Sequence, residues 1–258
     1  MNGHARDPLH EITINVESLL RSSRTIHDSG NYALSTHVSI LCIEESAKYL
    51  LVYCKAHLPH DVFRKRFQHV HKHAVSNAPW FLAGQFSVAY MLHITGEMVD
   101  KSESIRDQMR GLSQAVTEYI FQNDPQIVAE AIASVLAPKD AETDRQYRQF
   151  HDEREKDRVN SIYVDVSDDL VVTASPRSFG RAKSKEYVER AELCAALIQF
   201  LANPTADIVE FVDRLPPKER LRIKREGLRN ARTLIARLRA AGATPGTEGS
   251  AANEGNKS

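Results

Sequence analysis

Three ionisable side chains occur close together in the segment 44–48 (EESAK), within a helix predicted over residues 32–57. Glu45 and Lys48 are three residues apart and Glu44 and Lys48 four apart, so both pairs can meet on a helix surface. The helix is apolar almost all round, which is typical of a central helix, so the segment is expected in or near the interior. Because buried charges must be paired, the segment indicates either an internal salt bridge that fixes the helix register or a functional site.

A basic, histidine-rich segment follows at residues 60–75, where His69 and Lys72 are spaced i, i+3 on a predicted helix. Near neutral pH an imidazole can serve as general base or acid, and a nearby cation such as Lys72 or Arg64 can stabilise charge that develops on a phosphate. This combination suits metal-independent RNA cleavage, in which a ribose 2′-OH attacks the adjacent phosphate. The alternative is a solvated basic face.

A metal site is not expected in this segment. Its interspersed cations would repel a divalent ion, and no Cys joins the five histidines, which are His57, His60, His69, His71 and His73. For His71 and His73 taken singly, a solvated basic face is the favoured interpretation. The sequence also contains no Gly-rich phosphate loop, no GxSxG elbow and no HExxH motif, so no cofactor is predicted.

A third set of polar side chains, Glu155, Arg158, Tyr163 and Asp165, lies where a densely charged predicted helix gives way to β-favouring sequence. Side chains alternate along an extended chain, so Tyr163 and Asp165 would share one side and Val164 the other. An edge strand that packs Val164 inward explains the alternation equally well.

The last predicted helix, from about Pro216 to Ala240, is strongly basic. It could bind a nucleic-acid backbone or an acidic partner. A solvated amphipathic helix is the favoured alternative, with an apolar stripe formed by Leu221, Leu228, Ile235 and Leu238.

The elements that must position these side chains are helices. Apolar periodicity, prolines and turn residues predict an all-α protein, a multi-helix bundle with one short extended or hairpin segment near residues 161–173. Residues 12–202 are expected to form the helical domain, 203–240 a basic helical extension, and 241–258 a disordered, low-complexity tail. Other predicted helices cover residues 12–27, 80–95, 97–122, 125–136, 139–160, 183–202 and 206–213.

Composition sets outer limits on function. The chain has 258 residues with 34 basic and 34 acidic side chains, so no global field marks it as a nucleic-acid binder. Cys42, Cys54 and Cys194 are scattered and form no CxxC pair, which fits a reducing compartment. No signal peptide and no apolar run of about 20 residues is present, so a cytoplasmic protein without membrane spans is expected.

The order of these motifs over roughly residues 12–202 resembles the AbiV family of abortive-infection proteins. Four elements carry the resemblance: Glu-Glu-x-x-Lys at 44–48, Phe-x-His-x-x-Lys at 67–72, a charged helix leading to Tyr-Val-Asp at 163–165, and a Ser-Pro loop at 175–176 followed by the helix 183–202. The family often has Gly at the position of Ala47 and Lys at the position of Arg158. The basic helix after Pro217 and the tail look like additions.

AbiV proteins are grouped with the HEPN superfamily of helical bundles, and the resemblance therefore implies a HEPN-like fold. Many HEPN members are metal-independent ribonucleases with an Arg-x4–6-His motif. The chain contains three such spacings, Arg64–His69, Arg66–His71 and Arg145–His151. We favour Arg64–His69, because His69 also fits the family element.

The resemblance further implies an antiphage effector that arrests translation or growth on infection, with RNA cleavage as its reaction. It implies a homodimer, RNA or the ribosome as a partner, and a phage-encoded activator protein. The competing hypothesis is a non-catalytic protein whose polar cluster is a buried structural network and whose basic helix binds RNA, the ribosome or a phage protein.

For catalysis, we expect Glu45 and Lys48 to face His69 and Lys72. His69 would be general base or acid, Arg64 or Lys72 would stabilise phosphate charge, and Glu45 would orient Lys48 or His69. The segment 163–165 would bring its Tyr and Asp to the same cleft. The predicted site residues are Glu45, Lys48, Arg64, His69, Lys72, Arg158, Tyr163 and Asp165.

Overall fold

The part of the chain that the structure describes folds as helices with one small two-stranded hairpin, as the sequence predicts. The computed structural model describes residues 7–98, 107, 111–113, 115, 125–136, 141–202 and 208–242. Most of the predicted helix 97–122 and nearly all of the tail 241–258 lie outside the described residues. The first elements are α1 (Pro8–Asp28), α2 (Tyr32–Tyr53), η1 (Lys55–His57), α3 (His60–Arg64), α4 (His69–Val75), α5 (Ala78–Met98) and α7 (Pro125–Leu136). The later elements are α8 (Ala141–Asn160), β1 (Asp165–Val166), β2 (Val172–Ala174), η2 (Pro176–Ser178), α9 (Arg181–Ala202), α10 (Ile208–Arg214) and α11 (Pro217–Gly242).

Helices α1 and α2 form the predicted antiparallel pair. The Asp7 side chain accepts a hydrogen bond from the backbone of Leu9 and caps α1, and Asn31 caps α2 through the backbone of Leu34. Between them Gly30 has φ 85°, a left-handed conformation that costs glycine little. The tight turn sets the two helices side by side.

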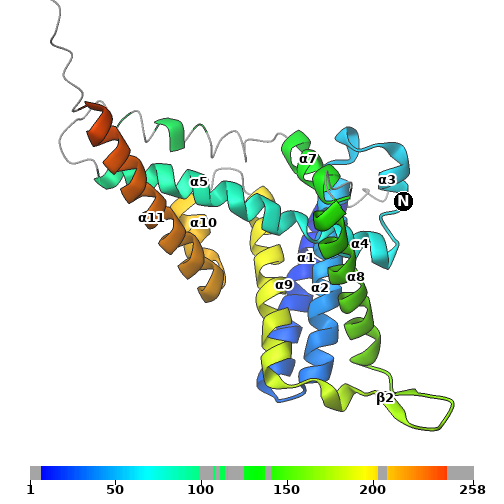
Figure 1. Ribbon diagram of the computed structural model, residues 1–258. Helices are drawn as coiled ribbons and strands as arrows, with labels where there is room; N and C mark the ends of the chain where they lie inside the picture. The colour runs from blue at the N-terminus through cyan, green and yellow to red at the C-terminus, as the bar shows by residue number, and fades with distance from the viewer. Residues whose placement is uncertain are drawn as a thin grey trace, which may run out of the picture.

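The main core lies where α1, α2 and α9 pack together, and α8 covers α2 from another side (Figure 1). The buried side chains of α2 include Ile40, Ile43, Leu50 and Leu51, which explains why this helix is apolar almost all round. All three cysteines are free thiols buried in this core region: Cys42, Cys54 and Cys194.

The histidine-rich segment is not the single helix that its sequence suggested. It is broken into α3 and α4, with a turn at residues 65–68 between them. Gln68 has extended backbone angles (φ −74°, ψ 128°) where α4 begins. The break redirects α4 so that it packs against α2 and α8.

The final helix, α11, packs along α5 at the end of the molecule opposite the strand hairpin (Figure 1). Its buried face carries Ile223, Gly227, Ala231 and Ile235, at intervals of four residues. A Cβ atom on Gly227 would lie 2.7 Å from Cδ1 of Tyr90, so glycine permits this close approach. The predicted apolar stripe was therefore wrong in part: Leu221 and Leu228 face outward, and only Ile235 of the stripe residues that can be described is buried.

Strands β1 and β2 pair antiparallel, with Val166 opposite Val172, so the segment near 161–173 is a hairpin. It projects from the lower end of the bundle (Figure 1). No helix among the described residues is long and apolar enough to cross a membrane.

Candidate functional site

Six ionisable side chains from three helices meet beside the middle of α2. We call them the Glu44 cluster: Glu44 from α2, His69, Lys72 and His73 from α4, and Glu155 and Arg158 from α8. The three α4 residues are spaced i, i+3 and i+4, so they share one helix face. The break before α4 and the packing of α8 on α2 bring these helices together.

Glu44 is the centre of the cluster, with its side chain only 2% exposed. Its Oε2 atom lies 2.7 Å from Nδ1 of His69 and 3.0 Å from Nζ of Lys72. Its Oε1 atom accepts no hydrogen bond and lies 3.4 Å from Nε2 of His73 and 4.0 Å from Nε of Arg158. A buried carboxylate is held in this way by the positive groups around it.

His69 is the exposed member of the cluster, with 47% of its side chain accessible. Because a carboxylate can only accept, the hydrogen bond to Glu44 places the imidazole proton on Nδ1. In the neutral ring the lone pair is then on the other nitrogen, Nε2, which makes no hydrogen bond within the described part of the chain. A carboxylate that orients an imidazole in this tautomer is the arrangement used by general bases.

His73, in contrast, is completely buried. Burial and the nearby Arg154 guanidinium lower the pKa of His73 to about 4, so its ring is neutral near pH 7. Its Nε2 donates to Oε2 of Glu155 at 3.2 Å, while its Nδ1 is buried without a partner. A proton on Nδ1 would therefore have no acceptor, which agrees with the neutral form even though two carboxylates lie nearby.

Glu155 and Arg158 form a two-pronged ion pair, with Nε to Oε2 at 2.9 Å and Nη2 to Oε1 at 2.7 Å. The hydrogen bonds from Arg158 lower the pKa of Glu155 to about 2, and those from Glu155 raise the pKa of Arg158. Arg158 stays partly exposed, so its guanidinium can reach a ligand.

Arg154 fastens α4 to α8 from a fully buried position. Its Nη1 donates to the backbone oxygen of His73 at 3.1 Å and to the hydroxyl of Ser76, and its Nη2 donates to Oδ1 of Asn77 at 3.4 Å. These contacts occupy the C-terminal end of α4, where carbonyl groups lack helical partners. Burial lowers the pKa of Arg154 to about 10, so it remains charged near neutral pH.

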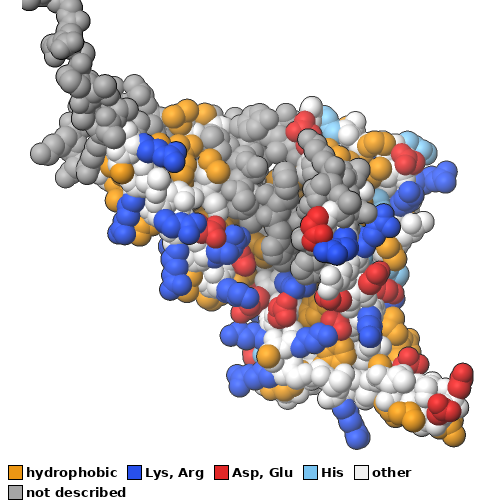
Figure 2. Space-filling view, viewed as in Figure 1, with side chains coloured by type: hydrophobic (Ala, Val, Ile, Leu, Met, Phe, Trp, Pro, Cys, Tyr) orange, Lys and Arg blue, Asp and Glu red, His pale blue; other side chains and the backbone are white. Residues whose placement is uncertain are grey.

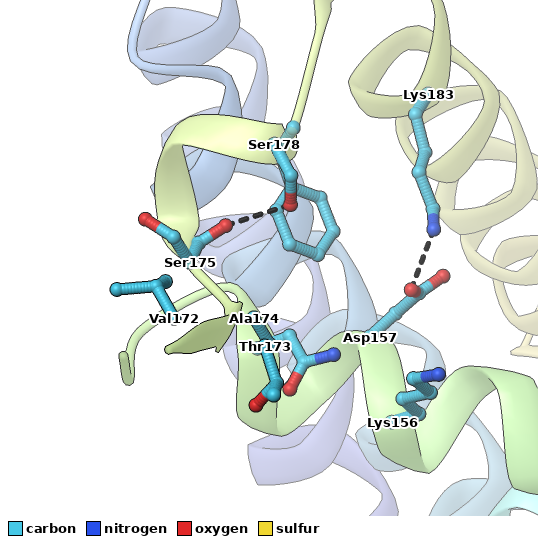
Figure 3. A pocket seen from close by; sticks show the side chains of 10 residues that line it. Lys156, Asp157, Val172, Thr173, Ala174, Ser175, Ser178 and Lys183 are labelled. Atoms are coloured by element: carbon cyan, nitrogen blue, oxygen red, sulfur yellow. Dashed lines mark hydrogen bonds and ion pairs between the residues drawn. The ribbon is translucent and has the colours of Figure 1, made fainter. Parts of the chain in front are cut away.

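A second polar contact fixes α8 against α9. Asp157 accepts from Nζ of Lys183 at 2.5 Å and from the Tyr187 hydroxyl at 2.7 Å. Figure 3 shows Lys183 and Asp157 pointing toward one another. Both residues line a cavity of about 380 Å³. The cavity lies between the end of α8, β2, η2 and the start of α9, and none of the predicted catalytic residues lines it.

The predicted position of Glu45 and Lys48 was wrong. These two side chains pair with each other at 2.5 Å, and Glu45 also accepts from Asn15 of α1 at 3.2 Å. The carboxylate that contacts His69 and Lys72 is that of Glu44, which lies on the more buried stripe of α2.

The other predicted residues divide into two groups. His69, Lys72 and Arg158 meet at Glu44. Arg64 is exposed at the end of α3 and makes no hydrogen bond or ion pair within the described residues. The expectation that the Tyr-Val-Asp segment enters the cleft was wrong for Asp165.

Tyr163 is 61% exposed in the chain that leads to β1. Its phenol is nevertheless near enough to contribute to the raised pKa of Arg158. Asp165 is exposed on the hairpin, where its Oδ1 accepts from the backbone of Val166. Asp165 leaves the bundle with the hairpin, whereas the backbone N–H of Tyr163 still donates to the carbonyl of Val159 in α8, at 3.0 Å.

Four contributors were not among the predicted site residues: Glu44, His73, Glu155 and Arg154. Glu155 had been noted beside Arg158 in the third set of polar side chains but was not given a site role. Glu44 shares a helical stripe with Ile40, Ala47 and Leu51, but the stripe of Glu45 is apolar as well, so the sequence did not separate the two glutamates. His73 is spaced i, i+4 from His69, so its position on the same helix face could have been predicted. Arg154 sits in a densely charged helix and gave no such signal.

In the described residues, no group of three His, Cys, Asp or Glu side chains is arranged to hold a metal ion.

A family comparison gives a match to the model described as AbiV, over residues 4–196. The chain belongs to the AbiV family. Comparison with curated proteins and with solved structures finds no match.

The family match confirms the resemblance to AbiV that the ordered motifs indicated. The all-helical, HEPN-type fold is also confirmed. The AbiV match contains every member of the Glu44 cluster and ends within α9, so α10 and α11 lie beyond it. Membership of the AbiV family indicates an abortive-infection, HEPN-like function.

Proposed function

We propose that this AbiV protein is an abortive-infection effector that arrests translation or growth by cleaving RNA at the Glu44 cluster without a metal ion. One observation carries the proposal: a half-exposed imidazole, His69, is held in one tautomer by a buried carboxylate, Glu44, beside a partly exposed guanidinium, Arg158. Spacing in the sequence had suggested Glu45 for the orienting role, and the contacts favour Glu44 instead.

In the proposed reaction, Nε2 of His69 takes the proton of a ribose 2′-OH. The O2′–P bond forms and the P–O5′ bond breaks, which leaves a 2′,3′-cyclic phosphate. The departing O5′ takes a proton from the imidazolium or from water. Arg158 stabilises the charge on the phosphate, and the exposed Arg64 contacts the RNA backbone.

The remaining cluster members support this chemistry through charge. Lys72 is mostly buried against Glu44, so it offsets that carboxylate instead of binding the phosphate directly. With His73 neutral, the charges of Lys72 and Arg158 balance those of Glu44 and Glu155. The buried Arg154, which lies beside the cluster, adds one positive charge. A local positive excess favours an anionic substrate.

The test is induction of the wild type and of His69→Ala in cells, followed by mapping of new RNA ends that carry a 2′,3′-cyclic phosphate. We expect the ends to appear with the wild type and to fall by about a hundredfold or more with His69→Ala, the usual contribution of a general base. His60→Ala, which removes an exposed histidine outside the cluster, is the matched control. Cleavage by purified protein should persist in EDTA. Undiminished cleavage by His69→Ala would refute the mechanism.

The deep burial of several side chains in and beside the cluster favours a second candidate function. Glu44, His73 and Arg154 are all at most 2% exposed, as in a purely structural network. In this alternative the protein is a non-catalytic binder of RNA, the ribosome or a phage protein through its basic last helix. His69→Ala would then keep both growth arrest and thermal stability, whereas charge reversal on α11 would abolish growth arrest.

The proposal includes self-association as a homodimer and activation by a phage-encoded protein. Both come from the resemblance to AbiV and HEPN proteins. Sedimentation of the purified protein, with and without a lysate from infected cells, measures each of them directly.

A further inference from the structure

The strand hairpin exposes an unusual amount of apolar surface. Val166 and Val172 are cross-strand partners and therefore lie on one face of the hairpin. Its large exposed side chains are Ile162, Tyr163, Val164, Val166, Leu170, Val171 and Val172. An isolated two-stranded hairpin is marginally stable in water, and exposed apolar side chains gathered on one element favour an interaction site there.

The tip of the hairpin adds negative charge and backbone strain. Asp165, Asp168 and Asp169 are exposed and make no ion pair within the described part of the chain. Leu170 is 85% exposed at φ 59°, a left-handed conformation that costs a branched side chain energy. Strained residues of this kind are concentrated at functional and ligand-contact sites. The hairpin thus presents apolar side chains bordered by carboxylates.

Helix α11 presents the complementary surface. Its outward face carries Leu221, 52% exposed, and Leu228, two turns further on. The same face carries Lys218, Arg225, Arg229 and Arg232, and none of these four cations forms an ion pair with the described residues. Other cations of this helix are paired: Arg222 with Glu219 and Glu226, and Lys224 with Asp213. We call the outward set of two leucines and four cations the α11 stripe.

These two surfaces cannot meet within one chain. The hairpin and α11 lie at opposite ends of the molecule (Figure 1). Figure 2 shows hydrophobic and acidic side chains at the hairpin end and basic side chains interspersed with hydrophobic ones over α11. A nucleic acid would suit the cations of the α11 stripe but not its exposed leucines. A surface of apolar and acidic side chains suits both parts of the stripe.

We propose that the hairpin of one copy docks on the α11 stripe of a second copy. In two copies placed antiparallel, each hairpin reaches the α11 of its partner, so both contacts form at once and the assembly closes as a two-fold dimer. Val166, Leu170 and Val172 cover Leu221 and Leu228, while Asp168 and Asp169 pair with Arg225 and Arg229. The proposal names the surfaces of the homodimer in the proposed function and does not depend on RNA cleavage.

The experiment is a charge exchange measured by analytical ultracentrifugation of the full chain. One variant carries Asp168→Lys and Asp169→Lys, and the other carries Arg225→Glu and Arg229→Glu. In either variant alone both contacts of a dimer bring like charges together, so we expect the dissociation constant to rise at least about a hundredfold. In an equal mixture of the two, every hairpin meets an α11 of opposite charge, so a heterodimer of wild-type strength should form.

All four substituted residues are exposed, so both variants should fold, and circular dichroism with thermal melting checks this. Asp152→Lys and Arg237→Glu are matched controls on α8 and α11, exposed but outside the two surfaces, and should dimerise as the wild type does. Raising the salt concentration should weaken the wild-type dimer.

A monomeric wild type, variants that still dimerise, or a mixture that stays monomeric would each overturn the proposal. So would a variant of α11 that loses RNA retention while its sedimentation is unchanged, because the stripe would then be a nucleic-acid surface. RNA cleavage is scored separately with His69→Ala, a residue outside both surfaces. Failure of one proposal is thereby distinguished from failure of the other.

Discussion

The Oε2 atom of Glu44 lies 2.7 Å from Nδ1 of His69, so a carboxylate on the central helix fixes the orientation of a ring that is open to solvent. The same oxygen lies 3.0 Å from the ammonium of Lys72. The neighbouring carboxylate of Glu45 is directed instead at Asn15 and Lys48. Two adjacent glutamates therefore have different surroundings, and this difference can be measured.

Glu44→Ala should lower the free energy of unfolding by about 3–5 kcal/mol, because it leaves a largely buried ammonium unpaired. Glu45→Ala is the matched control on the same helix. Its ion pair is partly exposed, and its removal should cost less than about 1 kcal/mol. Urea denaturation of both variants checks the contrast, and equal losses would contradict the central position assigned to Glu44.

The buried imidazole of His73 predicts a pH dependence of stability. Its pKa is lowered from 6.5 to about 4 in the folded chain, so between these values the unfolded state binds more protons. Stability is then fully present above about pH 6.5 and is lost as the pH falls through about 4, by roughly 3 kcal/mol. Denaturation of the wild type and of His73→Gln at a series of pH values checks this. The variant should show a shallower slope between pH 6.5 and 4, and an unchanged slope would count against a neutral His73.

The contact between α8 and α9 depends on a buried phenol. Tyr187 donates to Asp157 at 2.7 Å, and burial together with this neighbouring carboxylate raises the pKa of Tyr187. Tyr187→Phe should therefore cost about 1.5–3 kcal/mol, the usual value for a hydrogen bond to a charged group. Tyr163→Phe alters an exposed phenol and should change stability by less than about 0.5 kcal/mol. Thermal unfolding of the two variants measures the difference.

Close packing of α11 on α5 predicts a steric effect. Gly227→Ala places a methyl group 2.7 Å from the Tyr90 ring, and such overpacking should cost about 1–3 kcal/mol. Gly180→Ala is the control, because a Cβ there meets nothing within 4 Å. Calorimetric unfolding should separate the two alanine variants. If they melt together, α11 does not pack as tightly as described.

Helical periodicity was sufficient to predict most of the fold. The helices 125–136 and 183–202 were placed within two residues of their observed ends, because prolines and loop residues delimit them. The break between α3 and α4 was missed. Local propensity favours a continuous helix there, whereas contacts of α4 with α2 and α8 favour a turn, and such contacts are not visible in a single sequence.

The site was predicted in its chemistry but not in its geometry. The choice between Glu44 and Glu45 depends on which stripe of α2 is more deeply buried. Ile40, Ala47 and Leu51 on the Glu44 stripe are fully buried, whereas Leu34 on the Glu45 stripe is 39% exposed. Both stripes are apolar in sequence, so periodicity alone could not rank them.

The burial of Arg154 could not be predicted from the sequence, for a different reason. A helix with as many charges as α8 has the composition of a solvated helix, and nothing in its spacing distinguishes the one arginine that becomes buried. Its acceptors are the end of α4, some 80 positions earlier in the chain. Tertiary contacts of this kind are decided by how helices pack.

The three cysteines provide a reporter that needs no engineering. Burial raises the pKa of each thiol, to about 12 for Cys194, so the reactive thiolate is scarce while the chain is folded. An alkylating reagent can therefore modify Cys42, Cys54 and Cys194 only when the helices around them separate. The rate at which native protein gains mass in the presence of iodoacetamide thus reports how often the core opens, and the modified peptides identify which helices open first.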